Sequence, residues 1–193
     1  MMLEQLRKET RDLHTEIEKG NLAGFIMDHS ITTDQYKTLL LQNFIAYKIT
    51  EEAIFPYLNN FPNTKSTQLQ ADLNLLNVST ELVEFFKNDF FCNSKEEAIG
   101  AAYVVEGSVL GGMMIAKELK NCEYLKDISN HHFFNGDRNN VLGWKLFCKQ
   151  VNKSEFSQKQ IDKATQKAKE TFLFFGKVFL EVKEARNSVN SEL

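Results

Sequence analysis

Three glycines interrupt a strong helical pattern near the middle of the chain. Gly107, Gly111 and Gly112 lie between the stretches Lys95–Ile99 and Ile115–Lys120, whose residues are good helix formers. Each glycine inside a helix costs about 1 kcal/mol relative to alanine, so another interaction should offset that cost. A glycine lets backbone or a flat ligand approach the helix face, and it also allows the helix to bend. The pattern therefore indicates either a ligand surface or a close helix–helix contact.

His14 is the second position whose residue type could do chemistry. It continues the apolar stripe of a first predicted helix, and Glu18 lies four residues later on the same face. A metal-bound histidine normally gives its other ring N–H to an acceptor, and Glu18 could accept it; an exposed His–Glu pair is the simpler alternative. The chain has no HExxH motif and no pair of ExxH motifs, so zinc and di-iron sites are not indicated. A single histidine ligand is what a heme iron uses.

Composition excludes several classes of protein. The 193 residues suit one domain spanning 1–193, and a net charge of -3 gives no basic field for nucleic acid. Glu106 interrupts the longest apolar run, so we expect no membrane span. The glycine run lacks a following Lys-Ser/Thr and a preceding strand, which excludes a phosphate loop. Three cysteines without a CxxC motif favour a reducing, cytoplasmic compartment: Cys92, Cys122 and Cys148.

The scarcity of helix breakers predicts an all-helical chain. There are only two prolines and nine glycines, and apolar residues recur at helical spacing. The expected elements are a first helix ending near Gly20, a second from a cap at Thr32–Asp34 to near Pro56, a turn at Phe61–Thr64, helices over Ser66–Leu76, Thr80–Phe86 and Lys95–Leu119, a polar segment over His131–Asn140, a short helix through Trp144 and Phe147, and a long last helix capped by Ser157.

The glycine-bearing helix and the His14–Glu18 pair occur together in one known family. The segment Leu6–Glu18 resembles the proximal helix of the biliverdin-producing heme oxygenases. The segment Tyr103–Gly112 resembles their distal helix, closest to the bacterial branch that includes bacteriophytochrome-associated members. Ala168–Leu173 is similar to the family's final core helix, so the resemblance covers nearly the whole chain. It implies an all-α, single-domain heme oxygenase-like bundle with heme between a proximal and a kinked distal helix.

The resemblance also implies roles for these residues. His14 would be the proximal iron ligand and Glu18 its hydrogen-bonding partner, with Gly107, Gly111 and Gly112 over the distal face. The reaction would open heme, both substrate and cofactor, to biliverdin, CO and ferrous iron. It would use O2 and electrons from a separate donor such as ferredoxin, flavodoxin or a flavin reductase.

Heme propionates require cations or hydroxyl groups at the pocket edge. Arg7 lies two turns before His14 on the same face and matches a basic position in the family. Lys145 and Lys149, four residues apart around Trp144, are further candidates, and the Tyr103 hydroxyl could reach the same edge. Ordinary solvated side chains are the alternative for all four.

One departure from the family concerns the residue after the first distal glycine. Many members carry an acidic residue there, which organises water near bound oxygen, whereas this chain has Ser108. A hydroxyl donates and accepts hydrogen bonds but brings no charge. The bacterial branch with Glu-Gly-Ser also lacks the acid. Glu106, one residue before the glycine, is assigned a supporting role.

Two other functions stay open on the sequence. The first is a non-catalytic heme carrier or sensor with the same ligands, which Ser108 would allow. The second is a thiaminase-like hydrolase of the same architecture, which needs a pocket cysteine with acidic partners that the sequence does not display. The remaining histidines, His29, His131 and His132, have no partner in the sequence pattern, and we expect His131 and His132 to be an exposed loop pair.

Overall fold

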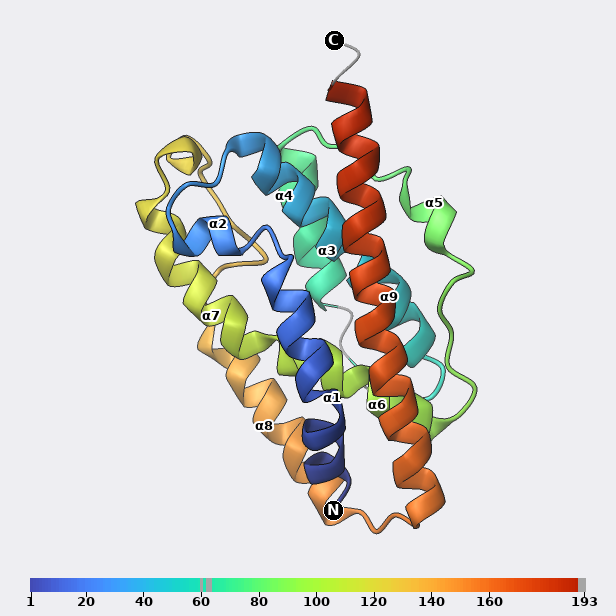
Figure 1. Ribbon diagram of the computed structural model, residues 1–193. Coiled ribbons are helices and arrows are strands. Elements are labelled where there is room, and N and C mark those ends of the chain that lie inside the picture. Colours follow the sequence, from blue (N-terminus) through green and yellow to red (C-terminus); the bar gives the residue numbers. More distant parts are fainter. Residues whose placement is uncertain (60, 62–63, 191–193) are drawn as a thin grey trace.

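The computed structural model describes residues 1–59, 61 and 64–190, and all regular structure in these ranges is helical (Figure 1). The all-α prediction is confirmed. The predicted turn at Phe61–Thr64 includes residues 62 and 63, which lie outside the described ranges. The elements are α1 Met2–Lys19, α2 Gly24–Met27, α3 Thr33–Ile54, α4 Thr64–Leu75, α5 Val83–Phe86, α6 Lys95–Gly107, α7 Val109–Glu118, the 3-10 turns η1 Leu119–Asn121 and η2 Glu123–Leu125, α8 Arg138–Lys153 and α9 Gln158–Asn190.

Helix α3 lies at the centre of the bundle. It packs against α4, α5, α6 and α9, and its residues from Thr38 to Tyr47 are all buried. Its start is fixed by a reciprocal cap, because the Thr32 hydroxyl accepts from the Gln35 N–H at 3.2 Å and the Thr32 N–H donates to the Gln35 side chain at 2.9 Å. The cap predicted at Thr32–Asp34 is therefore confirmed.

The crossing of α6 and α9 is the tightest helix contact for which a glycine is required. A Cβ atom placed on Gly100 would lie 2.0 Å from the carbonyl oxygen of Ala164, far inside any normal contact. Ala101 and Ala168 are fully buried as well, so small residues let the two backbones approach. At this glycine, helix–helix packing is a sufficient explanation.

The apolar stretch after Gly100 forms two helices rather than the single one that its pattern predicts. Ser108 ends α6 and begins α7 with a right-handed backbone at φ -66° and ψ -14°. Its hydroxyl donates to the Val105 carbonyl at 2.8 Å, a contact that bends helices. The two helices meet at an angle in Figure 1, as a kinked helix requires.

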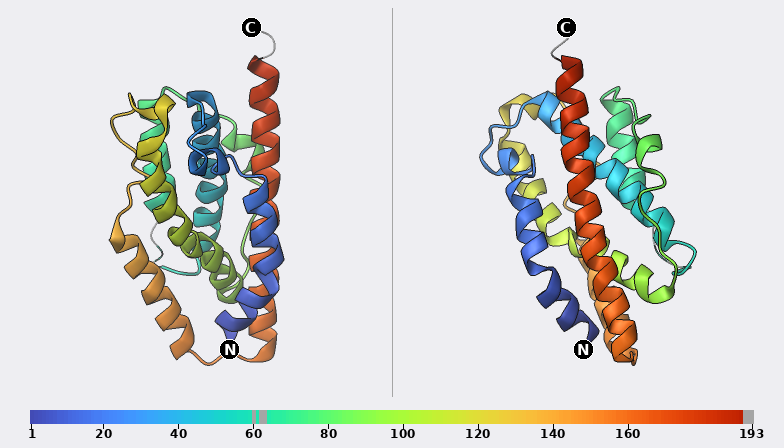
Figure 2. Two further views of the ribbon diagram at one scale, coloured as in Figure 1. Left: turned by 60° about the vertical axis from the view of Figure 1, so that its left-hand side comes forward. Right: turned by 45° about the vertical axis from the view of Figure 1, so that its right-hand side comes forward.

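Helices α1, α8 and α9 complete the frame around this bend. α9 packs against α1 and α6, and α8 contacts α1, α6 and α7 (Figure 2). α8 is much longer than expected and begins at Arg138, inside the segment predicted to be polar and irregular, where the Asp137 side chain accepts from the Asn139 N–H at 2.9 Å. α2 and the two 3-10 turns were not predicted, because each is too short to show a helical period.

One helical stretch is long and apolar enough, by length and composition alone, to cross a membrane. Residues Lys95–Asn121 have a mean hydropathy of 1.5 over an 18-residue window, half of which is buried inside the bundle. A core helix of a soluble protein gives the same result, so the stretch is weak support for a membrane location.

Candidate functional site

His14 is a partly exposed residue of α1 beside α9. Its side chain is 53% exposed, and Nδ1 lies 3.5 Å from Glu18 Oε2. The ring meets Phe172 of α9 edge-on, with centroids 5.7 Å apart. Glu18 and Phe172 thus restrain the imidazole from two sides, and the predicted His14–Glu18 pair is present. No group of three or more potential metal ligands occurs in the described part of the chain, so a metal here would rely on a single histidine.

The glycines at and after the bend, Gly107, Gly111 and Gly112, have room for side chains. A Cβ on Gly111 or Gly112 would meet nothing within 4 Å, and a Cβ on Gly107 would meet only Trp144, at 3.8 Å. An alanine would fit at all three positions without moving a neighbour. Close helix–helix contact, which explains Gly100, therefore does not explain these three glycines.

The surface beside Gly111 is apolar and uncovered. Leu110 is 56% exposed and Met114 is 61% exposed, and the three residues lie within one turn of α7. The same helix buries only Val109. An apolar helix face of this kind, with a glycine at its centre, can accept a flat hydrophobic ligand.

Arg7, Tyr103 and Cys148 meet where α1, α6 and α8 join. Burial raises the pKa of Tyr103, while hydrogen bonding to Thr10 and the charge of Arg7 lower it. Burial also raises the pKa of Cys148, and Arg7 again acts against the shift. Arg7 itself is exposed, as are the predicted propionate partners Lys145 and Lys149 of α8.

Trp144 lies in the site, although the sequence pattern predicted only that it belongs to a short helix. Its ring is nearest the position of a Gly107 Cβ, lies 5.8 Å from Tyr103 and stacks with Phe147 at 5.7 Å. It is the only tryptophan in the chain, a signal that could have identified it. It ties α8 to the bend of α6 and α7.

A buried polar network occupies the opposite side of the bend. The Glu51 carboxylate accepts from the backbone N–H groups of Lys65 and Ser66, both at 3.1 Å, and from the Ser66 hydroxyl. Burial raises the pKa of Glu51, and these hydrogen bonds act against the rise. Lys65 Nζ lies 3.4 Å from Glu106 Oε1, with both side chains almost fully buried. Glu106 is thus directed toward α4, and sequence reasoning missed its partner.

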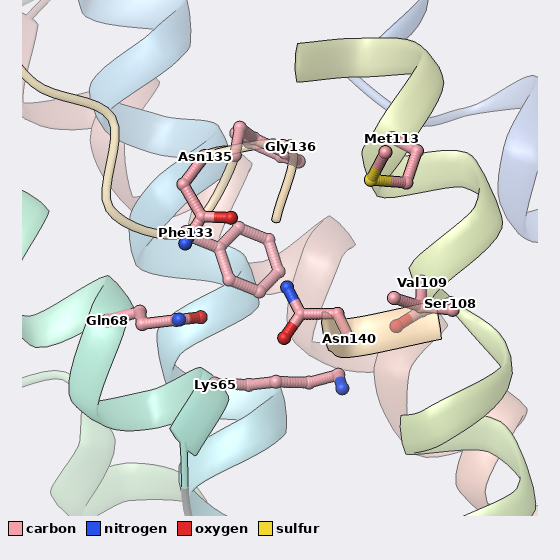
Figure 3. Close-up of a pocket in the computed structure, with 11 residues that line it drawn as sticks. Lys65, Gln68, Ser108, Val109, Met113, Phe133, Asn135, Gly136 and Asn140 are labelled. Carbon is pink, nitrogen blue, oxygen red and sulfur yellow. The ribbon is translucent and has the colours of Figure 1, made fainter. Parts of the chain in front are cut away.

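Ser108 connects the bend to this network. Burial raises the pKa of Tyr47, while a hydrogen bond with Ser108 lowers it, and Glu51 and Glu106 raise it further. Ser108 also lines a cavity together with Lys65, Gln68 and Asn140, shown in Figure 3.

The expectations for the other histidines were wrong in part. The Tyr36 hydroxyl and His131 Nδ1 are 2.7 Å apart, and His131 is half-buried rather than exposed. His29 Nε2 lies 2.9 Å from Glu118 on the surface. His132 is exposed as expected. The two overlooked partners are far away in sequence, so no local pattern revealed them.

The cysteines do not have the properties of nucleophiles. Cys92 and Cys122 are buried and Cys148 is half-buried. Burial raises the pKa of all three thiols, to about 12 for Cys92. A reactive cysteine needs a lowered pKa, so the geometry gives no support to the hydrolase alternative.

Comparison with known proteins identifies the class that this fold and site define. The heme oxygenase family profile matches residues 1–181, and the chain belongs to the heme oxygenase family. The family match and the shared fold identify the protein as a heme oxygenase enzyme. The resemblance inferred from the two motifs is confirmed. No curated protein sequence matches the chain significantly.

Solved structures show the same fold at low sequence identity. Heme oxygenase-1 of the cyanobacterium Synechocystis, in complex with heme, has a TM-score of 0.67 at 16% identity, with 100% of this chain and 99% of that chain covered. The NO- and CO-bound enzyme of Neisseria meningitidis has a TM-score of 0.70 at 18% identity, covering 94% and 92%. The Leptospira interrogans enzyme has a TM-score of 0.69 at 16% identity, covering 93% and 98%.

Proposed function

We propose that this protein binds heme between α1 and the α6–α7 bend and opens the ring to biliverdin, CO and ferrous iron. The observation that carries the proposal is the open space at Gly111 and Gly112 beside the exposed apolar face of α7. Helix packing does not use that space, whereas a porphyrin, which is flat and apolar, would fill it. The relatives named above include an enzyme described in complex with heme, which supports the same ligand.

The protein residues would hold and orient the ligand. His14 would hold the heme iron through Nε2, because its Nδ1 faces Glu18 at 3.5 Å. Glu18 would fix the orientation of the imidazole ring. When bound, heme supplies the iron that activates O2 and is itself the molecule oxidised.

The edge of the ligand would lie at the junction of α1, α6 and α8. Arg7, Lys145 and Lys149 are exposed cations on these helices, and the Tyr103 hydroxyl lies beside Arg7. Propionates at this edge would form charge-assisted hydrogen bonds with them. Gly107 and Gly112 would keep the distal side free of side chains, and Ser108 would be the nearest hydroxyl.

Electrons would come from a separate protein, such as ferredoxin, flavodoxin or a flavin reductase. The reducing environment that three unpaired thiols favour supports a cytoplasmic location. The exposed cations near the edge would suit an acidic donor.

The test is a visible absorption experiment with the purified protein and hemin. We expect a Soret band on mixing, and its decay with growth of a biliverdin band after a reductant is added in air with catalase. His14→Ala should weaken hemin binding by about 100-fold or more, and its hemin complex should lack the visible absorption spectrum of histidine-ligated heme. His29→Ala, which changes a surface histidine paired with Glu118, is the matched control and should behave as wild type.

Each result has a definite meaning. A Soret band that persists under reductant would favour a non-catalytic heme carrier, the function that the uncharged Ser108 would allow. Unchanged hemin binding in His14→Ala would overturn the ligand assignment. Absence of any Soret shift in the wild-type protein would overturn heme binding altogether.

A further inference from the structure

The Lys65–Glu106 ion pair lies behind the α6–α7 bend and has no evident structural purpose. Lys65 is 12% exposed and Glu106 is 10% exposed as side chains, with Nζ and Oε1 3.4 Å apart. Removing two charges from water is unfavourable, and their attraction offsets this only when the geometry is excellent and the remaining polar atoms are hydrogen-bonded. A buried ion pair is therefore weak support for stability, which suggests another role.

Both members of the pair have unused hydrogen-bonding capacity. An ammonium group donates three hydrogen bonds, and one acceptor, Glu106 Oε1, is found for Nζ among the described residues. Glu106 Oε2 points toward α8, where it would lie 3.6 Å from a Cβ at Gly143. Water is the usual partner for polar groups left over in this way.

A cavity adjoins the pair on the side of Lys65. It is lined by Lys65, Gln68, Ser108 and Asn140, and it has about 30 Å³ of space that water can occupy, enough for one or two molecules. Figure 3 shows the Lys65 side chain extending from α4 below Asn140, with Ser108 at the α7 side of the cavity. Asn135, another lining residue, is exposed, so the cavity reaches the surface.

The position of Lys65 is fixed from the other side by Glu51. That carboxylate accepts the N–H groups of Lys65 and Ser66 in the first turn of α4, where a negative charge is favourable. Glu51 therefore anchors the backbone of Lys65, from which the side chain reaches Glu106.

We propose that Lys65 and Glu106 are positioning residues that order water in this cavity and so deliver protons from the surface to Ser108 at the distal side of the bend. The proposal rests on the proposed function, because reduction of O2 to the level of water consumes protons. In each transfer a water or the Ser108 hydroxyl receives one proton and gives up another, so the path itself is unchanged. The pair would supply ionised groups beside the cavity, which Ser108 does not.

The first test measures ionisation at the distal side without turnover. The pH midpoint of the visible-spectrum change of the ferric hemin complex is determined for Glu106→Gln and Lys65→Met. Removal of the negative charge should lower the midpoint and removal of the positive charge should raise it, each by about half a unit or more. The titratable groups facing the pair, Tyr47 and Glu51 of α3, are left in place.

A matched control is available on the outer side of α3. Lys48 and Glu52 form an exposed ion pair of the same residue types. Lys48→Met and Glu52→Gln should leave the midpoint and the rate of ring opening as in the wild type. Hemin affinity should stay within about twofold in all four variants, since none of these residues belongs to α1 or α7, the helices that carry His14 and Gly111.

The second test allows for a single variant that fails to fold. The double variant Lys65→Met/Glu106→Leu removes both charges and keeps the volume apolar, which commonly preserves or increases stability. We expect unchanged hemin affinity, a rate of ring opening at least about tenfold lower and a larger solvent deuterium isotope effect.

The outcomes separate this proposal from the proposed function. If the wild type opens heme and the double variant opens it equally fast, the positioning role is wrong while the function stands. Midpoints that shift in the same direction in both single variants would also overturn it, because a purely structural disturbance has no charge-dependent sign. A wild type that fails to bind hemin overturns the function itself.

Discussion

Helices α6 and α7 come from one apolar stretch of sequence but are used differently. Nearly every residue of α6 from Ala98 to Glu106 is buried, whereas α7 buries only Val109. Two glycines illustrate the difference, because Gly100 has the Ala164 carbonyl against it and Gly111 has open space. The same residue type thus has different purposes: Gly100 permits packing, whereas Gly111 in α7, like Gly107 at the end of α6, leaves room.

The difference in burial also suggests that α6 contributes mainly to stability and α7 mainly to ligand binding. α6 crosses α9 and α3 within the core, and loss of that contact would separate the main helices. α7 has few buried apolar contacts and an exposed face, the properties of a segment with low local stability. Ligand sites are drawn from such segments, since a face already covered by protein cannot bind anything else.

Gly100→Ala should have the largest effect, on stability. The added Cβ would lie 2.0 Å from the Ala164 carbonyl oxygen, so α6 and α9 must move apart. We expect a loss of about 3 kcal/mol or more in the free energy of unfolding, measured by urea denaturation of the apoprotein. Gly176→Ala, an open glycine in α9, is the control and should cost nothing. Equal stability of the two variants would contradict the packing role of Gly100.

Gly111→Ala and Gly112→Ala should have the opposite effect: they should weaken hemin binding without destabilising the apoprotein. The free energy of unfolding of the apoprotein should stay the same or rise by up to about 1 kcal/mol, because alanine favours helix and meets no neighbour. Hemin affinity should fall by about tenfold or more, which is roughly 1.4 kcal/mol of binding free energy. Denaturation of the apoprotein and Soret titration measure the two quantities. A destabilised apoprotein with normal hemin affinity would mean that α7 packs like α6.

Hydrogen exchange should show the same division without any mutation. In the apoprotein we expect the amides of α7 to exchange faster than those of α6, since α7 is the less buried helix. Hemin should slow exchange in α7 by about tenfold or more and leave α6 nearly unchanged. Removal of hemin should restore fast exchange. Uniform protection of both helices before hemin is added would contradict the comparison.

The smallest effect concerns His131, in the loop that precedes α8. Burial lowers the pKa of His131, which bonds with the Tyr36 hydroxyl at 2.7 Å. The unfolded chain therefore binds a proton at His131 more readily than the folded chain. The free energy of unfolding should fall as pH drops below about 6.5, the ordinary histidine value, toward the lower folded pKa.

Comparison of two variants isolates that contribution. His131→Asn should reduce the loss of stability between pH 7.5 and 5.5, and the exposed neighbour changed in His132→Asn should leave it as in the wild type. Asp72, whose pKa burial raises, acts in the opposite direction and is present in both variants. Parallel pH profiles for all three proteins would exclude His131 as a source.

Local patterns in the sequence were sufficient for the helices and part of the site. The cap at Thr32 and the His14–Glu18 pair depend on residues within four positions of each other, and both are present. The bend at Ser108 is also local, because Gly107 and the serine hydroxyl act on their own turn.

Contacts between distant segments could not be predicted from one sequence. The pairing of Lys65 with Glu106 joins α4 to α6, and that of Tyr36 with His131 joins α3 to a polar loop. Residue type alone makes each of them look solvated. The space beside Gly111 is likewise a property of its neighbours, and the glycine pattern was equally compatible with packing.

The exposed face of α7 has a consequence for the amount of protein in a cell. Leu110 and Met114 are exposed apolar side chains on a helix that we expect to have low local stability, so a protease would cleave α7 readily in the apoprotein. A ligand that covers this face removes the cleavage target, so degradation would slow whenever heme is supplied. We expect limited proteolysis to cut within α7 only in the absence of hemin. The abundance of the enzyme would then follow its substrate with no change in the rate of its synthesis.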